Sequence, residues 1–480
     1  MNYRKNFRLL GFVLLIESFF LIFPIITALV FHEEFLPFLI TLCITLFVGL
    51  VLNATPVKTQ TLQAKDGFFI VTFSWLVMAL FGAIPFVLSS HGIPSYIDAF
   101  FETVSGFTTT GITILSDPST LSKGCLFWRA LTQWMGGMGV LVLMLAIVPL
   151  ANDNSMHVVR AEMAGPSIDK IVPRTRDMAI WMYCIYIGLT VMELTCLMIS
   201  GVPFFDALLH TFTTAATGGF STHAESVAFF QNPATQWVFT VFMFLFGVNF
   251  NVFFLLILRK ITKALKNEEL WVYIGLVLAS SFFIAFNVLS RYDNFSDSIR
   301  ESTFQVGSVM TTTGFSVTDS GAWPVFIRML LLFLMIFGAC AGSTGGAVKL
   351  SRLIILIKYV ISSFCQFAHP REVIAVKQDS KKLSNEVIRG TAVFVITYFL
   401  LIIIGAFFIA FEGYDFEYSL TVSISAIGDN GIGFGDVVST GYVGGFSVFN
   451  KLFISFLMLA GRLEVFPVVV LLLPATYRRK

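Results

Sequence analysis

The stretch "SGFTTTGITI" (105–114) lies between two long apolar segments, and it is too polar to continue either of them as a membrane helix. Related stretches return three times, as "TAATGGFSTH" (214–223), "VMTTTGFSVT" (309–318) and, in altered form, "AIGDNGIGFGD" (426–436). A chain that carries the same short pattern four times contains an internal repeat. The question is why a very hydrophobic chain needs four such interruptions.

The composition predicts a membrane protein with many spans. Of the 480 residues, 56% are hydrophobic and 12% are charged, whereas soluble domains carry roughly 25% charged residues. Nine apolar runs approach or exceed the ~20 residues that cross a bilayer as a helix. They are 9–31, 35–53, 69–88, 131–151, 180–200, 236–258, 271–289, 391–411 and 446–473. The first run is long and has no small-residue cleavage site after it, so we expect a retained span and not a signal peptide.

The basic residues are gathered in segments that an even number of crossings connects. These segments hold 24 of the 31 lysines and arginines. The positive-inside rule places such segments in the cytoplasm, which predicts that both termini are cytoplasmic and that the four Thr/Gly stretches face outward. The largest of the segments, 361–389, suits either docking of a partner or a plain solvated connection. The formal net charge of +2 gives no indication of nucleic-acid binding.

Aligning the chain with itself on Gly111, Gly219, Gly314 and Gly431 extends the repeat. Each anchor follows an acidic residue by 13 or 14 positions, namely Asp98, Asp206, Glu301 and Glu417. About three helical turns fit between acid and anchor, which is too short for a span but suits a re-entrant helix. We expect the acids to be helix caps more than ion ligands, and Glu102 and His210 inside these helices to be buried polar anchors.

Each unit is therefore predicted to be a span, a short pore helix, a Thr/Gly stretch and a second span. The expected divisions are 1–67 (two N-terminal spans), 68–160 (repeat 1), 161–267 (repeat 2), 268–382 (repeat 3, with a broken second span) and 383–480 (repeat 4). Bare backbone at membrane depth survives only inside protein or beside water. Four such loops around one axis would satisfy this condition, and their carbonyls could replace the hydration shell of an ion. The predicted fold is an all-α membrane protein with four repeats in pseudo-fourfold arrangement around one central pore.

The motifs "TTTGIT", "ATGGFSTH", "TTTGFSV", "GACAGSTGGAVK" (338–349) and "GRLEVFPV" (461–468) resemble the Trk/Ktr/HKT superfamily of cation transporters. The two additional N-terminal spans resemble its TrkH branch. The resemblance covers essentially the whole chain and implies potassium uptake through four filter segments. The filter residues it implies are Thr110, Gly111, Ile112, Thr217, Gly218, Gly219, Phe220, Thr313, Gly314, Phe315, Asn430, Gly431 and Ile432.

The resemblance also implies potassium as the transported ion, a homodimer in the bacterial inner membrane surrounded by lipid, and a cytosolic nucleotide-binding regulatory ring of the TrkA type. No nucleotide is expected on this chain itself. Relatives commonly read Asn-x-Gly-Pro-Gly in the fourth filter, whereas this chain has Asp429-Asn430-Gly431-Ile432-Gly433. Asp429 is expected either to attract cations near the filter mouth or to bond local amides. Serine at the first filter position goes with sodium preference in the plant branch, so Gly111 favours potassium.

Two features of the spans suggest control of the pore. Arg462 lies deep in the run 446–473, where a charge is costly, and it serves either as a positive barrier below the filter or in a structural ion pair. Small residues interrupt the run 325–360, namely Gly338, Ala339, Cys340, Ala341, Gly342, Ser343, Thr344, Gly345 and Gly346. Such a run has poor helix propensity. It predicts a gating loop, the alternative being close helix packing, and Lys349 and Arg352 after it are expected to be cytosolic handles.

The competing functions are a proton- or sodium-coupled potassium symporter and a sodium-selective pore. Glu102, His210 or Asp429 could serve a symporter as the titrating group. An enzyme is not expected, because the chain has no HExxH, no Walker A sequence and no Ser/His/Asp grouping. The sequence alone does not choose between channel and symporter.

Overall fold

The computed structural model describes residues 3–55, 64–139, 175–369, 375–379, 381–433 and 441–474. The described residues are mostly helical, with one small antiparallel hairpin of β1 (Lys377–Gln378) and β2 (Lys381–Lys382). Within them, seven helices are long and apolar enough to cross a membrane, or up to nine if each of two bent helix pairs counts as one span. The protein is thus an all-α membrane protein, as predicted.

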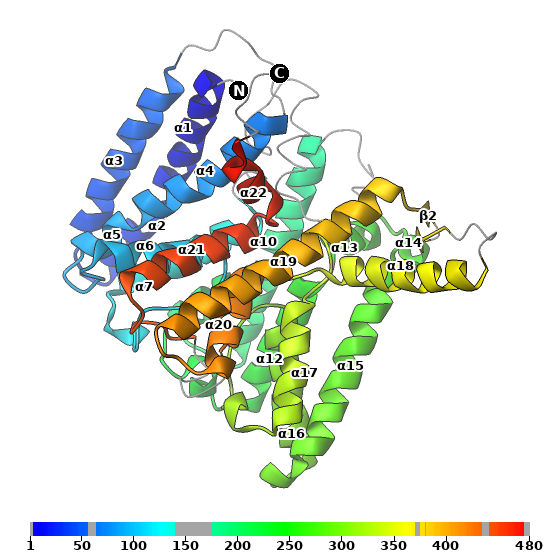
Figure 1. Ribbon diagram of the computed structural model, residues 1–480. Helices are drawn as coiled ribbons and strands as arrows, with labels where there is room; N and C mark the ends of the chain where they lie inside the picture. Colours follow the sequence, from blue (N-terminus) through cyan, green and yellow to red (C-terminus); the bar gives the residue numbers. More distant parts are fainter. Residues whose placement is uncertain are drawn as a thin grey trace.

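Two spans precede the repeats. The first consists of α1 (Tyr3–Phe20) and α2 (Ile22–Val30), and the second is α3 (Leu36–Asn53). They pack side by side at one edge of the molecule (Figure 1). The start of α1 and the end of the last helix, α22 (Phe466–Leu472), lie on the same face.

The remaining helices form four units of the predicted kind. The first spans are α4 (Ala64–Gly82) with α5 (Ile84–Leu88), α10 (Thr175–Ile199), α15 (Glu268–Val288) and α19 (Asn385–Phe411). The short pore helices are α6 (Tyr96–Phe107), α11 (Phe204–Ala215), α16 (Phe295–Met310) and α20 (Phe416–Gly428). The second spans are α7 (Lys123–Gly137), α12 (Pro233–Gly247) with α13 (Phe250–Ile257), α17 (Val325–Ile336) with α18 (Leu350–Ala368), and α21 (Val448–Arg462) with α22. Short turns are η1 (Pro118–Thr120), η3 (Ser226–Phe229), α14 (Ile261–Ala264), η4 (Leu289–Arg291) and η5 (Ser320–Ala322).

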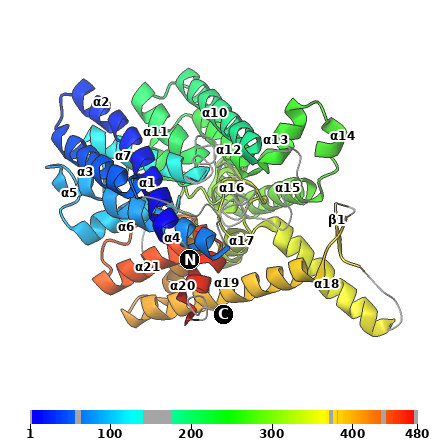
Figure 2. The same cartoon turned by 90° about the horizontal axis from the view of Figure 1, so that it is seen from above.

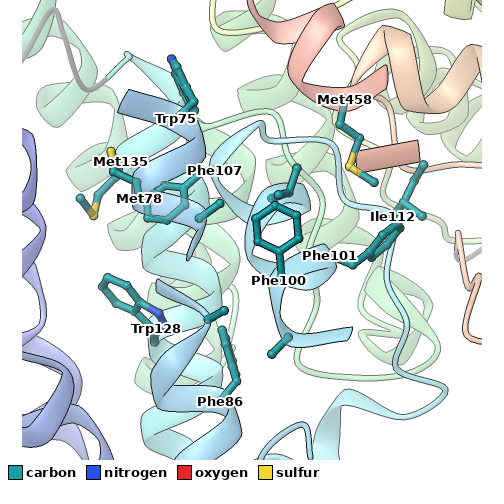
Figure 3. Packing of buried hydrophobic residues seen from close by; sticks show 14 of the residues in the cluster. Trp75, Met78, Phe86, Phe100, Phe101, Phe107, Ile112, Trp128, Met135 and Met458 are labelled. Atoms are coloured by element: carbon teal, nitrogen blue, oxygen red, sulfur yellow. The ribbon is translucent and has the colours of Figure 1, made fainter. Parts of the chain in front are cut away.

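Seen from above, the four units surround a common centre in chain order (Figure 2). The pore helices face this centre and are almost wholly buried towards their C-terminal ends. Figure 3 shows the packing of α6, whose Phe100, Phe101 and Phe107 lie among side chains of α4 and α7 and near Met458 of α21. Apolar packing against α4, α7 and α21 fixes a helix that is too short to span the bilayer.

The second spans are broken more often than the sequence predicted. Only the run 325–360 was expected to break, and it does, between α17 and α18. However, α12 and α13 meet at 90°, and α21 and α22 meet at 120°. Both bends follow a glycine that has no room for a side chain. A Cβ on Gly461 would overlap the carbonyl of Ile427, and one on Gly247 would lie 2.5 Å from Tyr273 Oη and 2.9 Å from Thr311 Cγ2. The second part of the run 131–151 lies outside the described residues.

The acidic residues before the anchors are not caps, so that prediction was wrong. Side-chain caps come from Ser95 on α6 and Asp415 on α20, while α16 begins six residues before Glu301. The four acids instead bind neighbouring segments. Their partners are Lys451 Nζ for Asp98 (2.7 Å), Thr222 Oγ1 for Asp206 (2.9 Å), Tyr292 Oη for Glu301 (2.7 Å) and Arg328 Nη1 for Glu417 (2.5 Å).

Candidate functional site

The four Thr/Gly stretches share one backbone conformation. The anchors Gly111, Gly219, Gly314 and Gly431 have φ of +85°, +72°, +82° and +77°. Two residues before each anchor, a non-glycine residue is also left-handed, namely Thr109 (58°), Thr217 (53°), Thr312 (59°) and Asp429 (52°). Positive φ is uncommon outside glycine, so its return at the same two positions makes the segments structurally equivalent.

The anchors form a closed ring. A Cβ on Gly111 would overlap the carbonyl oxygen of Gly218, one on Gly219 that of Thr313, and one on Gly314 that of Asn430. A Cβ on Gly431 would lie 2.7 Å from the carbonyl oxygen of Thr110, which closes the ring from repeat 4 back to repeat 1. Each anchor therefore touches the next segment around a shared axis. Glycine is required here for space as well as for its φ.

The other predicted filter residues are buried, and their side chains pack away from one another. Ile112, Phe315 and Ile432 belong to three different hydrophobic clusters. The hydroxyls of Thr110 and Thr313 lie 2.7 Å from those of Thr108 and Thr311. These residues bring backbone to the ring, and their side chains anchor it from outside.

Helix α7 supports the second filter segment through two residues that the sequence analysis did not single out. Arg129 Nε lies 2.7 Å from Glu102 Oε1, Nη1 donates to Ser221 O at 3.0 Å, and the guanidinium lies 3.4 Å from the centre of the Phe220 ring. One turn further, Gln133 Nε2 donates to Gly218 O (2.8 Å), and Gln133 Oε1 accepts from Phe220 N (3.1 Å). Arg129 and Gln133 are four residues apart and therefore share one face of α7. This spacing is the signal in the sequence that could have identified them.

Glu102 and His210 are buried polar anchors, as predicted. Glu102 also accepts from Thr113 Oγ1 (2.8 Å) and Ile114 N (3.0 Å). The His210 ring nitrogens lie 2.8 Å from Asp206 O and 3.0 Å from Ser221 Oγ. Glu102 thus holds the backbone that follows filter segment 1, and His210 holds the side chain of Ser221 after filter segment 2.

The predicted gating residues form a non-helical loop against one end of the ring. Gly346 N donates to Thr312 Oγ1 at 2.7 Å, and Gly346 packs so closely on Asp429 that a Cβ would lie 2.9 Å from the Asp429 Cβ. A Cβ on Gly345 would lie 2.9 Å from Thr311 O. The loop therefore touches filter segments 3 and 4 directly.

The rest of the loop is held by the broken second span of repeat 2 and by α15. Cys340 N donates to Gly247 O (3.1 Å), Phe250 N to Gly342 O (3.0 Å) and Ala341 N to Glu269 Oε1 (2.8 Å). The loop is not a close helix–helix contact, because α17 ends at Ile336 and α18 begins only at Leu350.

Arg462 ends α21 beside this loop. Its Nη1 donates to Thr344 O (3.0 Å), and its Nη2 donates to Gly136 O (2.6 Å) and Gly137 O (2.8 Å). Glu464 forms its ion pair with Arg352. Lys349, which donates to Gly345 O, and Arg352 are 4% and 7% exposed, so the prediction that they are cytosolic handles was wrong.

A cavity of about 90 Å³ lies beside the loop and the end of filter segment 4. Its lining includes Asp429, the loop residues Gly345 and Gly346, and the charged side chains of Lys349 and Arg462. Asp429 thus lies at the end of its filter segment that faces the loop. It accepts a hydrogen bond from Thr110 Oγ1 (2.8 Å).

Comparison with known proteins agrees with this architecture. The family model for TrkH, described as "Cation transport protein", matches residues 36–476. The chain belongs to the TrkH family. The match to the TrkH model includes α3, all four filter segments, the loop and Arg462.

Several members of the TrkH family are similar to this chain along all or nearly all of its length. The Trk system potassium uptake protein TrkH of Salmonella typhimurium is 34% identical over 100% of both chains. TrkG of Escherichia coli K12 is 32% identical over 96% of both. The crystal structure of the potassium transporter TrkH from Vibrio parahaemolyticus superimposes with a TM-score of 0.90, at 30% identity and with full coverage of both chains.

Proposed function

We propose that this protein takes up potassium across the bacterial inner membrane through the ring of four filter segments. The observation that carries the proposal is the closed contact of Gly111, Gly219, Gly314 and Gly431 with the carbonyls of the following segments. The names of the TrkH-family relatives, which are potassium uptake proteins and potassium transporters, supply the ion.

The ring suits a cation that has lost its water. Carbonyl oxygens of the predicted filter residues would replace the hydration shell, as in potassium-channel filters. Each pore helix ends at its filter segment, with C-caps at Thr108, Ala216, Thr311 and Asp429. The partial negative charge at four helix C-termini favours a cation there.

Flow through the ring is proposed to be controlled by residues 338–346 and Arg462. The contact of Gly346 with Thr312 and Asp429 supports a closed pathway in this conformation. The Arg462 guanidinium beside the cavity adds a positive charge that a cation has to pass. Moving the loop away from the ring would break the Arg462–Thr344 hydrogen bond as well.

The assembly is proposed to be a homodimer that binds a cytosolic TrkA-type nucleotide-binding ring, with both termini in the cytoplasm. The long helix α18 and the basic β1–β2 hairpin project from the body of the protein (Figure 2). Apolar side chains on α18 are exposed, including Phe364 and Phe367 at 69% and 82%. We propose these elements as contact surfaces. The repeat boundaries given above also remain a proposal, and the one at 160/161 lies outside the described residues.

The test is the reversal potential of the purified protein in liposomes, across separate gradients of potassium, sodium and pH. A potential that follows the potassium gradient alone supports a potassium-selective pathway. A potential that depends on the potassium gradient together with the pH or sodium gradient would instead support coupled symport. A potential that follows the sodium gradient alone would support the sodium-selective pore. Gly219→Ala, which places a methyl group in the ring, is the inactive control. Gly188→Ala on α10, where a Cβ meets nothing within 4 Å, is the matched active control.

A further inference from the structure

We propose that Glu269 is a positioning residue for the loop 338–346, and that one oxygen of its carboxyl group keeps the loop against the ring by binding the backbone on both sides of the loop. The inference rests on the proposed function for the role of the loop in controlling flow. It adds a residue of the first span of repeat 3, which belongs neither to the filter segments nor to the loop.

Glu269 is the second residue of α15, and it is 3% exposed. Its Oε1 accepts two backbone hydrogen bonds, from Ala341 N at 2.8 Å and from Ser351 N at 2.9 Å. Ala341 belongs to the first half of the loop, whereas Ser351 is the second residue of α18, just after the loop. The helices α15 and α18 meet at this point (Figure 1). A single oxygen atom therefore bridges the two sides of the loop.

The bond to Ser351 caps α18. The first amides of a helix have no acceptor within the helix, and the N-cap residue usually supplies an oxygen to the second or third of them. The N-cap of α18 is Lys349, and within the described residues its side chain makes no capping bond. Lys349 Nζ instead donates to Gly345 O. Glu269 supplies the missing acceptor from another helix, so the start of α18 is tied to α15.

The segment between the two bonds is the one that touches the ring. Gly346, five residues after Ala341 and five before Ser351, donates from its N to Thr312 Oγ1 at 2.7 Å. Both amides that Glu269 binds are buried. Without an acceptor they would be unsatisfied for as long as the loop lies on the ring, and a buried donor without a partner is costly. The contact with Glu269 thus stabilises the position of the loop seen here.

A role in stabilising α15 alone does not explain this geometry. Acidic residues in the first turn of a helix commonly complement the helix dipole, and Glu268 stands in the same turn. The cap of α15 is Asn267, whose Oδ1 accepts from Leu270 N at 2.8 Å. Glu268 pairs with Lys358 Nζ at 2.6 Å. Glu269 is the acidic residue of this turn whose carboxyl group is turned towards the loop.

The contact needs an acceptor oxygen and not a charge. Charged and neutral carboxyl groups both present such an oxygen, and the side-chain amide of glutamine presents one at the same distance from the backbone. Glu269→Gln should therefore keep the loop on the ring, whereas Glu269→Ala should release it. Glu269→Asp withdraws the oxygen by one methylene group and should release the loop in part, so it tests the proposal even if the alanine variant folds poorly.

The first measurement is the rate at which N-ethylmaleimide alkylates Cys340 in the detergent-purified full-length protein, resolved by peptide mass spectrometry. Cys340 lies in the loop and is 1% exposed, whereas Cys365 on α18 is exposed and serves as the internal reference. Glu269→Ala should raise the Cys340 rate relative to Cys365 by about tenfold or more, because two buried amides lose their acceptor. Glu269→Gln should restore the wild-type rate. Glu386→Ala, at the exposed second position of α19 in repeat 4, should leave the rate unchanged.

The second measurement is rubidium uptake into liposomes that contain the same variants and no regulatory partner. Glu269→Ala should raise the uptake rate, which a merely structural role would not do, and Glu269→Gln should return it to that of wild type. An unchanged Cys340 rate in both Glu269→Ala and Glu269→Asp, or an equal rise in Glu269→Gln and Glu269→Ala, would overturn the proposal. A raised Cys340 rate with unchanged rubidium uptake would keep Glu269 as the residue that positions the loop. It would refute the control of flow by the loop, which belongs to the proposed function.

Discussion

Arg462 Nη1 lies 3.0 Å from the carbonyl oxygen of Thr344, so a side chain of repeat 4 holds the loop of repeat 3. The same guanidinium reaches Gly136 and Gly137 at the end of α7 in repeat 1. Three repeats thus meet at one side chain directly beside the ring. The loop and Arg462 are therefore directly linked and form one structural unit.

Replacing Arg462 with alanine should therefore increase cation flux. The change removes both the positive charge and three charge-assisted hydrogen bonds, each contributing about 1.5–3 kcal/mol at most. Rubidium uptake into liposomes should rise in the alanine variant. Arg462→Lys keeps the charge but loses the forked guanidinium, so its uptake rate should lie between those of wild type and the alanine variant. An unchanged or lower flux in the alanine variant, with the protein correctly inserted, contradicts a barrier role.

Substituting an anchor glycine should abolish selective uptake. In Gly314→Ala, the new methyl group meets the Asn430 carbonyl, and the left-handed φ of +82° adds strain of about 1–3 kcal/mol. Complementation of potassium-starved, uptake-deficient cells should fail. The matched variant Gly275→Ala, on α15 with nothing within 4 Å of the added Cβ, should complement normally. Normal growth of both would argue against close contact in the ring.

The buried Glu102–Arg129 pair should be strongly coupled. Glu102→Gln alone leaves the Arg129 charge buried and should lower the free energy of unfolding by about 3–5 kcal/mol. The double variant with Arg129→Gln should cost clearly less than the sum of the single changes. Asp297→Asn, in the more exposed Asp297–Arg300 pair, should cost less than about 1 kcal/mol. Thermal or denaturant unfolding in detergent measures the free energy of unfolding of the two single variants, the double variant and Asp297→Asn. Additive effects of Glu102→Gln and Arg129→Gln would exclude the coupling.

Acidification should destabilise the segment after filter segment 2, which carries His223. Its ring stacks on Phe229 with centroids 3.6 Å apart, and burial lowers the pKa of His223 below its usual 6.5, against the opposing charge of Asp206. The folded protein then binds this proton less readily than the unfolded chain, so stability is lost as the pH falls through about 6.5. The apparent Tm should fall between about pH 7.5 and 5.5, and by less in His223→Gln. The same pH slope in both proteins would rule out this residue as a source.

Local sequence signals predicted the parts of the site that depend on local conformation. Gly111, Gly219, Gly314 and Gly431 were found by comparing the chain with itself, because the left-handed turn demands glycine in every repeat. The small-residue run predicted the loop for the same reason. By contrast, the partners of Asp98 and Glu417 are basic residues of other repeats, and no spacing along the chain encodes such contacts.

The burial of charged side chains was also not predicted from the sequence. Lys349 resembles a cytosolic lysine in sequence, yet the loop before it folds under the ring, so its ammonium lies on the Gly345 carbonyl. The bends after Gly247 and Gly461 were also missed. Only the packing explains why glycine stands at these two places, with Tyr273 and Thr311 against Gly247 and the carbonyl of Ile427 against Gly461.

The most direct measurement of the central claim is the anomalous scattering of rubidium soaked into crystals of this protein. The account predicts ordered peaks on the axis that Gly111, Gly219, Gly314 and Gly431 enclose. Rubidium bound elsewhere in the membrane region, with the enclosed axis empty, would contradict it.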